Sequence, residues 1–339
     1  AAYMRNHMAS QRADAASRRY ALATYFCPRS AGNGIFNFLN AFALAVVTNR
    51  TLVARIGNHT HGWSVDRRAA CDAVLTLRDW VPREDAMGLS AANWTGIPGW
   101  RSPGEAQILR TPGLDALPAR YLDFWGMFGH NAAGVAMPEA RRCLSAVAES
   151  RAAVLFGGGL DLAYGTLFHA AFRLAAPPPT LSGAFSVAVH SRHRGGANAA
   201  NDGRDISREA SCLRRVIDAA RPCIVHIMAD REATRTNLSA FVQSELGCAT
   251  LVAPIGADDY GMEAEHGPAH AFFRDLAVAT AATDGIVTTV PSTASNLVAA
   301  LVAHGHSRAY RHRPLVRCLV THGGGRWPCL SGVIVLNDH

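Results

Sequence analysis

Lysine is absent from the chain, so arginine supplies all 33 basic side chains among 339 residues. The guanidinium group stays charged at physiological pH, and its planar fork bonds two phosphate oxygens at once. The formal net charge is +7, and the basic residues are spread along the chain rather than gathered in one helix or tail. This distribution favours small anionic ligands, and we expect no nucleic-acid partner.

The chain also lacks an apolar run long enough to cross a bilayer, for which roughly 18–20 residues are needed. The longest such run, from Ile35 to Val47, is interrupted by Asn37 and Asn40. The sequence begins at Ala1 without a methionine, which leaves room for a removed signal or anchor. We therefore expect contact with a membrane only through a missing N-terminal anchor.

Eight cysteines occur without a CxxC pair, so a zinc site of that type is not expected. Cys318 and Cys329 flank a short loop, which predicts a disulfide if the compartment is oxidising. Four glycosylation sequons favour such a compartment, the lumen of the secretory pathway in the Golgi or the endoplasmic reticulum. They begin at Asn49, Asn58, Asn93 and Asn237.

The sequence divides at Pro177-Pro178-Pro179, because three consecutive prolines resist helix formation and act as a semi-rigid spacer. Hydrophobic residues make up 49% of the chain and charged residues 17%, which fits a globular enzyme. The length allows two domains, each with its own core. We predict a flexible N-terminal arm over 1–19, an N-terminal domain over 20–176, a linker over 177–182, a C-terminal domain over 183–310 and a tail over 311–339.

Strands and helices alternate regularly after the prolines. Short apolar runs predict the strands, and apolar residues at helical spacing predict the helices between them. The N-terminal half begins in the same way, with a strand over 21–26, a helix over 35–47 and a strand over 51–56. The alternation is typical of an α/β fold with parallel, doubly wound sheets. In the C-terminal half we predict strands over 185–190, 223–229, 250–255 and 285–290, and helices over 207–220, 231–246, 268–282 and 293–304.

A cluster of cationic and imidazole side chains follows the strand predicted over 185–190. It comprises His190, Arg192, His193 and Arg194. Open α/β sheets bind their ligands outside the carboxyl ends of the strands. Like charges at this spacing repel one another unless an anion lies among them. The cluster therefore predicts a phosphate site, with a solvated arginine loop as the alternative.

Three further loops at predicted strand ends carry groups suited to a nucleotide. Gly32-Asn33-Gly34 precedes the first predicted helix, where glycines and free amides accommodate an anion, although a plain turn is the alternative. Asp230 either caps the following helix or hydrogen-bonds a nucleobase or ribose. Ser292 and Thr293 either cap a helix or contact a phosphate.

Three segments resemble the motifs of one enzyme family. Val187-Ala-Val-His190-Ser-Arg192-His193 is similar to the HxRR or HxRH signature of the α-1,6- and protein-O-fucosyltransferases, and especially to its rhizobial nodulation fucosyltransferase version. The segment that begins at Gly32 resembles the opening helix motif of this superfamily. The segment from Phe272 to Thr293 resembles its third motif. The resemblance covers roughly 21–56 and 183–304.

The resemblance implies a GT-B fold, in which two Rossmann-like domains face each other across a cleft. The C-terminal domain would then bind the donor, and the N-terminal domain the acceptor. It also implies an inverting glycosyltransferase that transfers fucose from GDP-fucose to a glycan or glycoprotein without a metal or other cofactor. No clear DxD motif, which metal-dependent glycosyltransferases use, occurs in the sequence.

Site residues follow from the same resemblance. Arg192 falls on the family's essential arginine, and His193 falls on the second catalytic position. The residues that would bind the donor are Gly32, Asn33, Gly34, His190, Arg192, Arg194, Asp230, Ser292 and Thr293. An inverting transfer can also use a base that accepts the proton of the acceptor hydroxyl. The candidates for that base are Asp123, Glu263, Glu265 and His266.

Two other functions stay open. Asn296 stands where many family members carry arginine, and Gly195-Gly196 replaces a polar pair. Both departures fit a catalytically silent glycan-binding or structural module. An NAD-type oxidoreductase is disfavoured, because Gly32-Asn33-Gly34 is not the GxGxxG fingerprint of dinucleotide sites.

Overall fold

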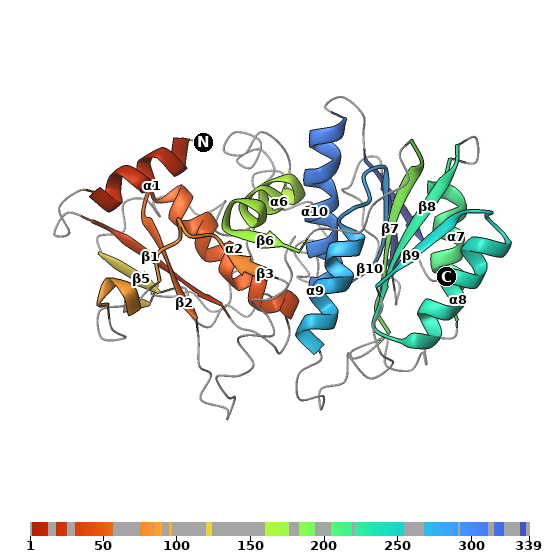
Figure 1. The fold of residues 1–339 in the computed structure, drawn as a ribbon, viewed down its shortest axis with the longest axis horizontal. Coiled ribbons are helices and arrows are strands. Elements are labelled where there is room, and N and C mark those ends of the chain that lie inside the picture. The colour runs from red at the N-terminus through yellow and green to blue at the C-terminus, as the bar shows by residue number, and fades with distance from the viewer. Residues whose placement is uncertain are drawn as a thin grey trace.

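The computed structural model of the chain describes residues 2–12, 18–25, 31–56, 75–83, 85–89, 95–96, 120–123, 160–175, 183–193, 205–218, 221–253, 268–290, 292–310, 315–321 and 333–336. These residues form a four-stranded sheet, a six-stranded sheet and a two-stranded pair. The four-stranded sheet lies at one end of the molecule and the six-stranded sheet at the other (Figure 1). The predicted α/β class with parallel sheets is confirmed.

The N-terminal sheet is parallel, with the strand order β2-β1-β5-β4. Helix α2 (Ala31–Val47) joins β1 to β2 and packs on β1. It has 17 residues, and no helix within the described ranges is both long and apolar enough to cross a membrane. The strands are β1 (Tyr20–Tyr25), β2 (Thr51–Ile56), β4 (Thr95–Gly96) and β5 (Tyr121–Asp123).

A helix, α1 (Ala2–Arg12), occupies most of the segment that the sequence predicted to be a flexible arm. The Tyr3 hydroxyl donates to the Arg50 carbonyl at 2.8 Å and accepts from the Leu52 amide at 3.3 Å. The His7 ring lies edge-on to Trp80, with 4.9 Å between the ring centroids. The prediction of a flexible arm is therefore wrong over 2–12, because these side chains anchor a polar helix to the N-terminal half.

The C-terminal sheet has six parallel strands in the order β12-β11-β10-β7-β8-β9. Counted from β7, this is the 3-2-1-4-5-6 order of doubly wound nucleotide-binding sheets. The chain runs outward from β7 to β9 and then returns to β10 on the other side of β7. The strands are β7 (Phe185–Ser191), β8 (Cys223–Ala229), β9 (Ala249–Val252), β10 (Gly285–Val290), β11 (Val316–Thr321) and β12 (Val333–Leu336).

Different helices cover the two faces of this sheet. Val187 and Val189 of β7 belong to a core that includes Leu213 of α7, whereas Ala188 belongs to a core that includes Leu297 of α10. Successive side chains of a strand point to opposite faces, so odd positions of β7 face α7 and even positions face α10. The helices are α7 (Ser207–Val216), α8 (Glu232–Ser244), α9 (Pro268–Ala279) and α10 (Thr293–Ala309).

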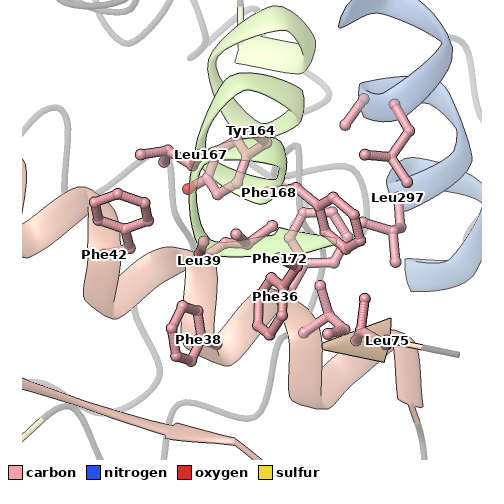
Figure 2. Close-up of a cluster of buried hydrophobic side chains, with 14 of the residues drawn as sticks. Phe36, Phe38, Leu39, Phe42, Leu75, Tyr164, Leu167, Phe168, Phe172 and Leu297 are labelled. Carbon is pink, nitrogen blue, oxygen red and sulfur yellow. The ribbon is translucent and has the colours of Figure 1, made fainter. Parts of the chain in front are cut away.

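Helix α10 also packs against the N-terminal half, along helix α6 (Leu160–Ala171). The two helices approach so closely that a Cβ on Gly165 would lie 2.2 Å from the Ala300 carbonyl oxygen. Figure 2 shows aromatic side chains of α2 and α6 in one buried cluster with Leu75 and Leu297. The two halves therefore share a core, and the cleft between them stays a prediction. The remaining elements are β3 (Leu75–Leu77), η2 (Asp85–Met87) and β6 (Phe172–Leu174), of which β3 and β6 form the antiparallel pair.

Two disulfides tie the C-terminal unit together, and every cysteine within the described residues belongs to one of them. Cys212 of α7 bonds Cys318 of β11, and Cys223 of β8 bonds Cys248 just before β9. The predicted disulfide between Cys318 and Cys329 is therefore wrong, because Cys318 lies within a strand and faces α7. The tail predicted over 311–339 supplies β11 and β12, so it is part of the six-stranded sheet.

Candidate functional site

The predicted phosphate-binding cluster lies where the strand order of the six-stranded sheet reverses. Strands β7 and β10 are hydrogen-bonded neighbours, and the chain leaves them toward opposite edges of the sheet. The carboxyl ends of such a strand pair are the place where doubly wound sheets bind nucleotides. His190 lies near the end of β7, Arg192 follows β7, and Ser292 follows β10. The fold therefore places residues predicted from separate motifs at one edge of the sheet.

His190 is buried and joins β7 to the start of α10. Its Nδ1 lies 2.6 Å from the Ser295 hydroxyl, and that hydroxyl donates to the Thr289 carbonyl at 2.5 Å. Because the hydroxyl hydrogen is used on the carbonyl, Nδ1 of His190 must carry a proton and donate. Burial lowers the pKa of His190 to about 3, so the ring is neutral at physiological pH. His190 therefore fixes the end of β7 through contacts inside the protein.

Ser191 and His193 turn to the opposite face, where Glu209 of α7 holds them. The Ser191 hydroxyl donates to Oε1 of Glu209 at 2.5 Å and lies 2.8 Å from Nε2 of His193. The Glu209 carboxylate is also 3.7 Å from Nε2 of His193. None of the three residues is more than 2% exposed. His193, predicted as a second catalytic group, is thus enclosed among protein groups.

Asp230 joins the end of β8 to the segment that follows β7. Its Oδ1 accepts from the His193 amide at 2.8 Å, and its Oδ2 lies 3.3 Å from Nη1 of Arg192. The side chain of Arg192 is 40% exposed, whereas that of Asp230 is 1% exposed. Asp230 is not the N-cap of the next helix, because the N-cap of α8 is Arg231, which makes no side-chain cap hydrogen bond.

A buried ion pair between Arg235 and Asp275 fixes the end of β8, directly before Asp230. Arg235 of α8 donates from Nε and Nη2 to the Ala229 carbonyl at 2.9 and 2.6 Å, and its guanidinium also pairs with Asp275 of α9. The pair is at most 5% exposed. It fixes the last residue of β8 and therefore the direction in which Asp230 leaves the strand.

Ser292 is the N-cap of α10, and its side chain accepts from the Ser295 amide at 3.3 Å. Of the two roles that the sequence left open for Ser292, capping is therefore the one that the structure shows. The helix has 17 residues, and its N-terminal amides lie at the switch point between β7 and β10. Such an end favours an anion through its free N–H groups and its dipole.

Gly32-Asn33-Gly34 was predicted to precede the first helix, and that prediction is wrong. Helix α2 begins at Ala31, so the three residues form its first turn. The apolar periodicity starts only at Ile35, so it gives no sign of the first turn of the helix. Helix α2 contacts the C-terminal unit mainly through α10.

Several predicted site residues lie outside the described residues. Arg194, Glu263, Glu265 and His266 belong to this group. Asp123 ends β5, and Thr293 begins α10, but their side chains are not among those described. In the described part of the chain, no group of three or more histidine, cysteine or acidic side chains could hold a metal ion. Metal independence stays a prediction.

Sequence reasoning missed Ser191, Glu209 and Ser295, which hold the cluster in place. Ser191 sits between two predicted site residues, and the motif gives it no role of its own. Glu209 follows Arg192 by 17 positions along the chain, and no local pattern marks it. The useful signal would have been the strand alternation, which places Ser191 and His193 on the face that α7 covers.

No protein-family model matches the chain, and no curated protein sequence matches it. Among solved structures, it is similar to the fucosyltransferase NodZ from Bradyrhizobium, with a TM-score of 0.45 and 14% identity over 83% of this chain and 93% of that one. It is also similar to a mutant of Arabidopsis thaliana FUT1 in complex with GDP, with a TM-score of 0.48 and 12% identity over 88% of this chain and 76% of that one. At these identities a function has to be argued from the residues of the chain itself.

Proposed function

We propose that the protein is an inverting glycosyltransferase that uses a nucleotide-diphosphate sugar, with GDP-fucose as the donor. One observation carries the proposal. Among the four residues from His190 to His193, three side chains are buried in hydrogen bonds within the protein, and only that of Arg192 is substantially exposed. It extends from the switch point of a doubly wound sheet, beside the N-terminus of α10.

A nucleotide diphosphate fits this arrangement. Its two phosphates need cationic donors fixed in place, and arginine provides a fork that bonds two oxygens. The amides of α10 add donors for the same anion. Asp230 orients Arg192, because one carboxylate oxygen contacts the guanidinium while the other holds the His193 amide.

The proposed reaction breaks the bond between the anomeric carbon of the sugar and an oxygen of the β-phosphate. The electron pair leaves with the diphosphate, where Arg192 stabilises the charge that develops in the transition state. The acceptor oxygen bonds the same carbon from the opposite face, which inverts its configuration. The acceptor proton passes to a base, for which Asp123, Glu263, Glu265 and His266 are the candidates.

Three finer parts of the proposal rest on the motif resemblance. Fucose as the sugar, the absence of a metal ion and a GT-B cleft follow from the similarity of the segment around Arg192 to the fucosyltransferase signature. In this proposal the N-terminal half binds the acceptor, a glycan or glycoprotein. The C-terminal half binds the donor through Arg192, Asp230 and the start of α10.

A second function, binding of the donor without transfer, is favoured by one observation. His193 occupies the second position of the signature, and its side chain is 0% exposed and faces Glu209. Within the described residues from His190 to His193, the leaving diphosphate would then meet one exposed cation, Arg192. We therefore propose His193 as a group that holds the segment in place rather than one that contacts the donor.

Titration calorimetry with GDP, UDP and NAD separates these functions. We expect the protein to bind GDP in the presence of EDTA, more tightly than UDP, and not to bind NAD. Release of GDP from GDP-fucose on incubation with a mixture of glycans identifies the transferase. Binding of GDP-fucose without release of GDP identifies a protein that binds the donor without transfer. Absence of nucleotide binding contradicts both of these functions and favours the catalytically silent glycan-binding or structural module.

The compartment is also a proposal: the lumen of the secretory pathway, where disulfides persist. Asn49 tests it, because this sequon residue is exposed in the turn between α2 and β2, with a φ of 48°. We expect protein secreted from cultured eukaryotic cells to carry an N-glycan on Asn49, detected by mass spectrometry of the glycosidase-treated peptide. Asn49→Gln should remove this glycan, and with it the decrease in gel mobility that the glycan causes. A secreted protein with unmodified Asn49 contradicts the prediction.

A further inference from the structure

We propose that Glu209 is a positioning residue for Arg192 and acts through Ser191 and His193. The inference rests on the proposed function, because it assigns Arg192 to the diphosphate. Glu209 lies in the first turn of α7 and is 2% exposed. Its carboxylate contacts Ser191 and His193, which are the two neighbours of Arg192 in the chain.

The argument begins with the end of β7. The last ladder pair of β7 with β8 joins Ser191 to Ala229, so the backbone after Ser191 has left the sheet. Arg192 is the next residue. A segment that leaves a sheet loses the regular hydrogen bonds that fix a strand, and its direction has to be fixed by other contacts.

Glu209 supplies such contacts on one face of the segment. It accepts from the Ser191 hydroxyl at 2.5 Å, and that hydroxyl lies 2.8 Å from Nε2 of His193. The residues on both sides of Arg192 are thereby held by one buried carboxylate. Asp230 holds the same segment from the side of β8 through the His193 amide. The Cα–Cβ direction of Arg192 is therefore set from both sides.

This arrangement matters because an arginine side chain carries about 2 kcal/mol of rotamer entropy. Catalysis by a charged donor depends on its being in place before charge develops, so that little reorganisation is needed. The side chain of Arg192 is 40% exposed, and its guanidinium contacts Asp230. A rigid backbone at Arg192 then limits the directions in which this exposed side chain can extend.

The opposite end of β7 provides a matched control. Asp284 is a buried carboxylate that accepts from both the amide and the hydroxyl of Ser186, each at 3.0 Å. It holds the amino end of the strand as Glu209 holds the carboxyl end. Loss of Asp284 should affect stability to a similar degree, but it cannot redirect Arg192, which lies at the other end of the strand.

The test is a double-mutant cycle read by calorimetric GDP affinity and by release of GDP from GDP-fucose. We expect Glu209→Ala to weaken both by roughly 10- to 100-fold, the scale that misplacement of a reacting group produces. In the Arg192→Ala background, Glu209→Ala should change GDP affinity by less than about twofold, because its effect passes through Arg192. Asp284→Ala should leave GDP affinity of the folded protein within about twofold of the wild type.

Glu209→Gln keeps an acceptor oxygen for the Ser191 hydroxyl, so it should recover most of the affinity that Glu209→Ala loses. If Glu209→Ala does not fold, as judged by circular dichroism, Ser191→Ala replaces it in the same cycle, since it removes the bridging hydroxyl. Additive losses in the cycle, or equal losses for the glutamine and alanine variants, overturn the positioning role while leaving the proposed function intact. Wild-type protein that binds no GDP, or binds it independently of Arg192, overturns the proposed function and the positioning role with it.

Discussion

Replacement of Arg192 by alanine is expected to slow the release of GDP from GDP-fucose by about 100- to 1000-fold, which corresponds to the loss of one preorganised donor to a developing oxyanion. The guanidinium contacts charge that is larger in the transition state than in the bound donor, so the turnover number should fall more than donor affinity does. Steady-state kinetics with varied GDP-fucose separates the two quantities. Arg192→Lys should fall between the wild type and Arg192→Ala, because it keeps the charge and loses the fork.

Arg214 provides the control for this prediction. It is 54% exposed and pairs with Glu245 at 2.5 Å on the surface of the C-terminal unit, so it resembles Arg192 in charge and in having a carboxylate partner. An exposed pair of this kind contributes little to stability. We expect Arg214→Ala to have wild-type kinetics. If Arg192→Ala and Arg214→Ala turn over the donor equally well, Arg192 is not the group that stabilises the leaving diphosphate.

Loss of the Cys212–Cys318 disulfide is expected to lower the free energy of unfolding more than loss of the Cys223–Cys248 disulfide. The two bonds span 106 and 25 residues of chain. In the chain-entropy account, loops of these lengths correspond to about 4.7 and about 3.5 kcal/mol of stabilisation. Urea denaturation of the two double-alanine variants, handled so that no new disulfides form, measures the difference in their free energies of unfolding.

The longer-range disulfide should also affect the site, because Cys212 is one turn of α7 beyond Glu209. We expect the Cys212→Ala/Cys318→Ala variant to bind GDP more weakly than the Cys223→Ala/Cys248→Ala variant at a temperature where both are folded. Equal stabilities and equal GDP affinities for the two variants would contradict this account of α7. The wild-type protein treated with a reductant, which breaks both disulfides, gives an independent measure of their combined effect on stability and on GDP affinity.

The sequence predicts those parts of the fold that depend on local patterns. The strands at 51–56, 223–229 and 285–290 were predicted with the bounds that the structure has, because each is a short apolar run between turns. Helix α10 extends beyond the predicted 293–304, since its last turns contain His306 and Arg308, which interrupt the apolar spacing. Strands β11 and β12 were not predicted, because short strands after the regular alternation have no helix between them to mark the pattern.

The contacts that assemble the site depend on tertiary structure, and the sequence could not predict them. Arg192 and Asp230 were predicted from strand ends, and the parallel sheet brings them together because neighbouring strands end at the same edge. The contact of Glu209 with Ser191 depends on where α7 crosses the sheet, which no residue spacing encodes. Disulfide pairing is of the same kind, since eight cysteines allow about 105 connectivities and spacing alone does not choose among them.

The close packing of α10 on α6 has a consequence for the way the two halves can move. The first turn of α10 lies at the proposed donor site, and Ala300, two turns later, presses on the backbone of α6 at Gly165. An α-helix is stiff over this length, so displacement of one turn displaces the others. A displacement of α6 should therefore also shift the first-turn amides of α10. If the proposed function is correct, donor binding and the position of the N-terminal half would be coupled through this one rigid helix.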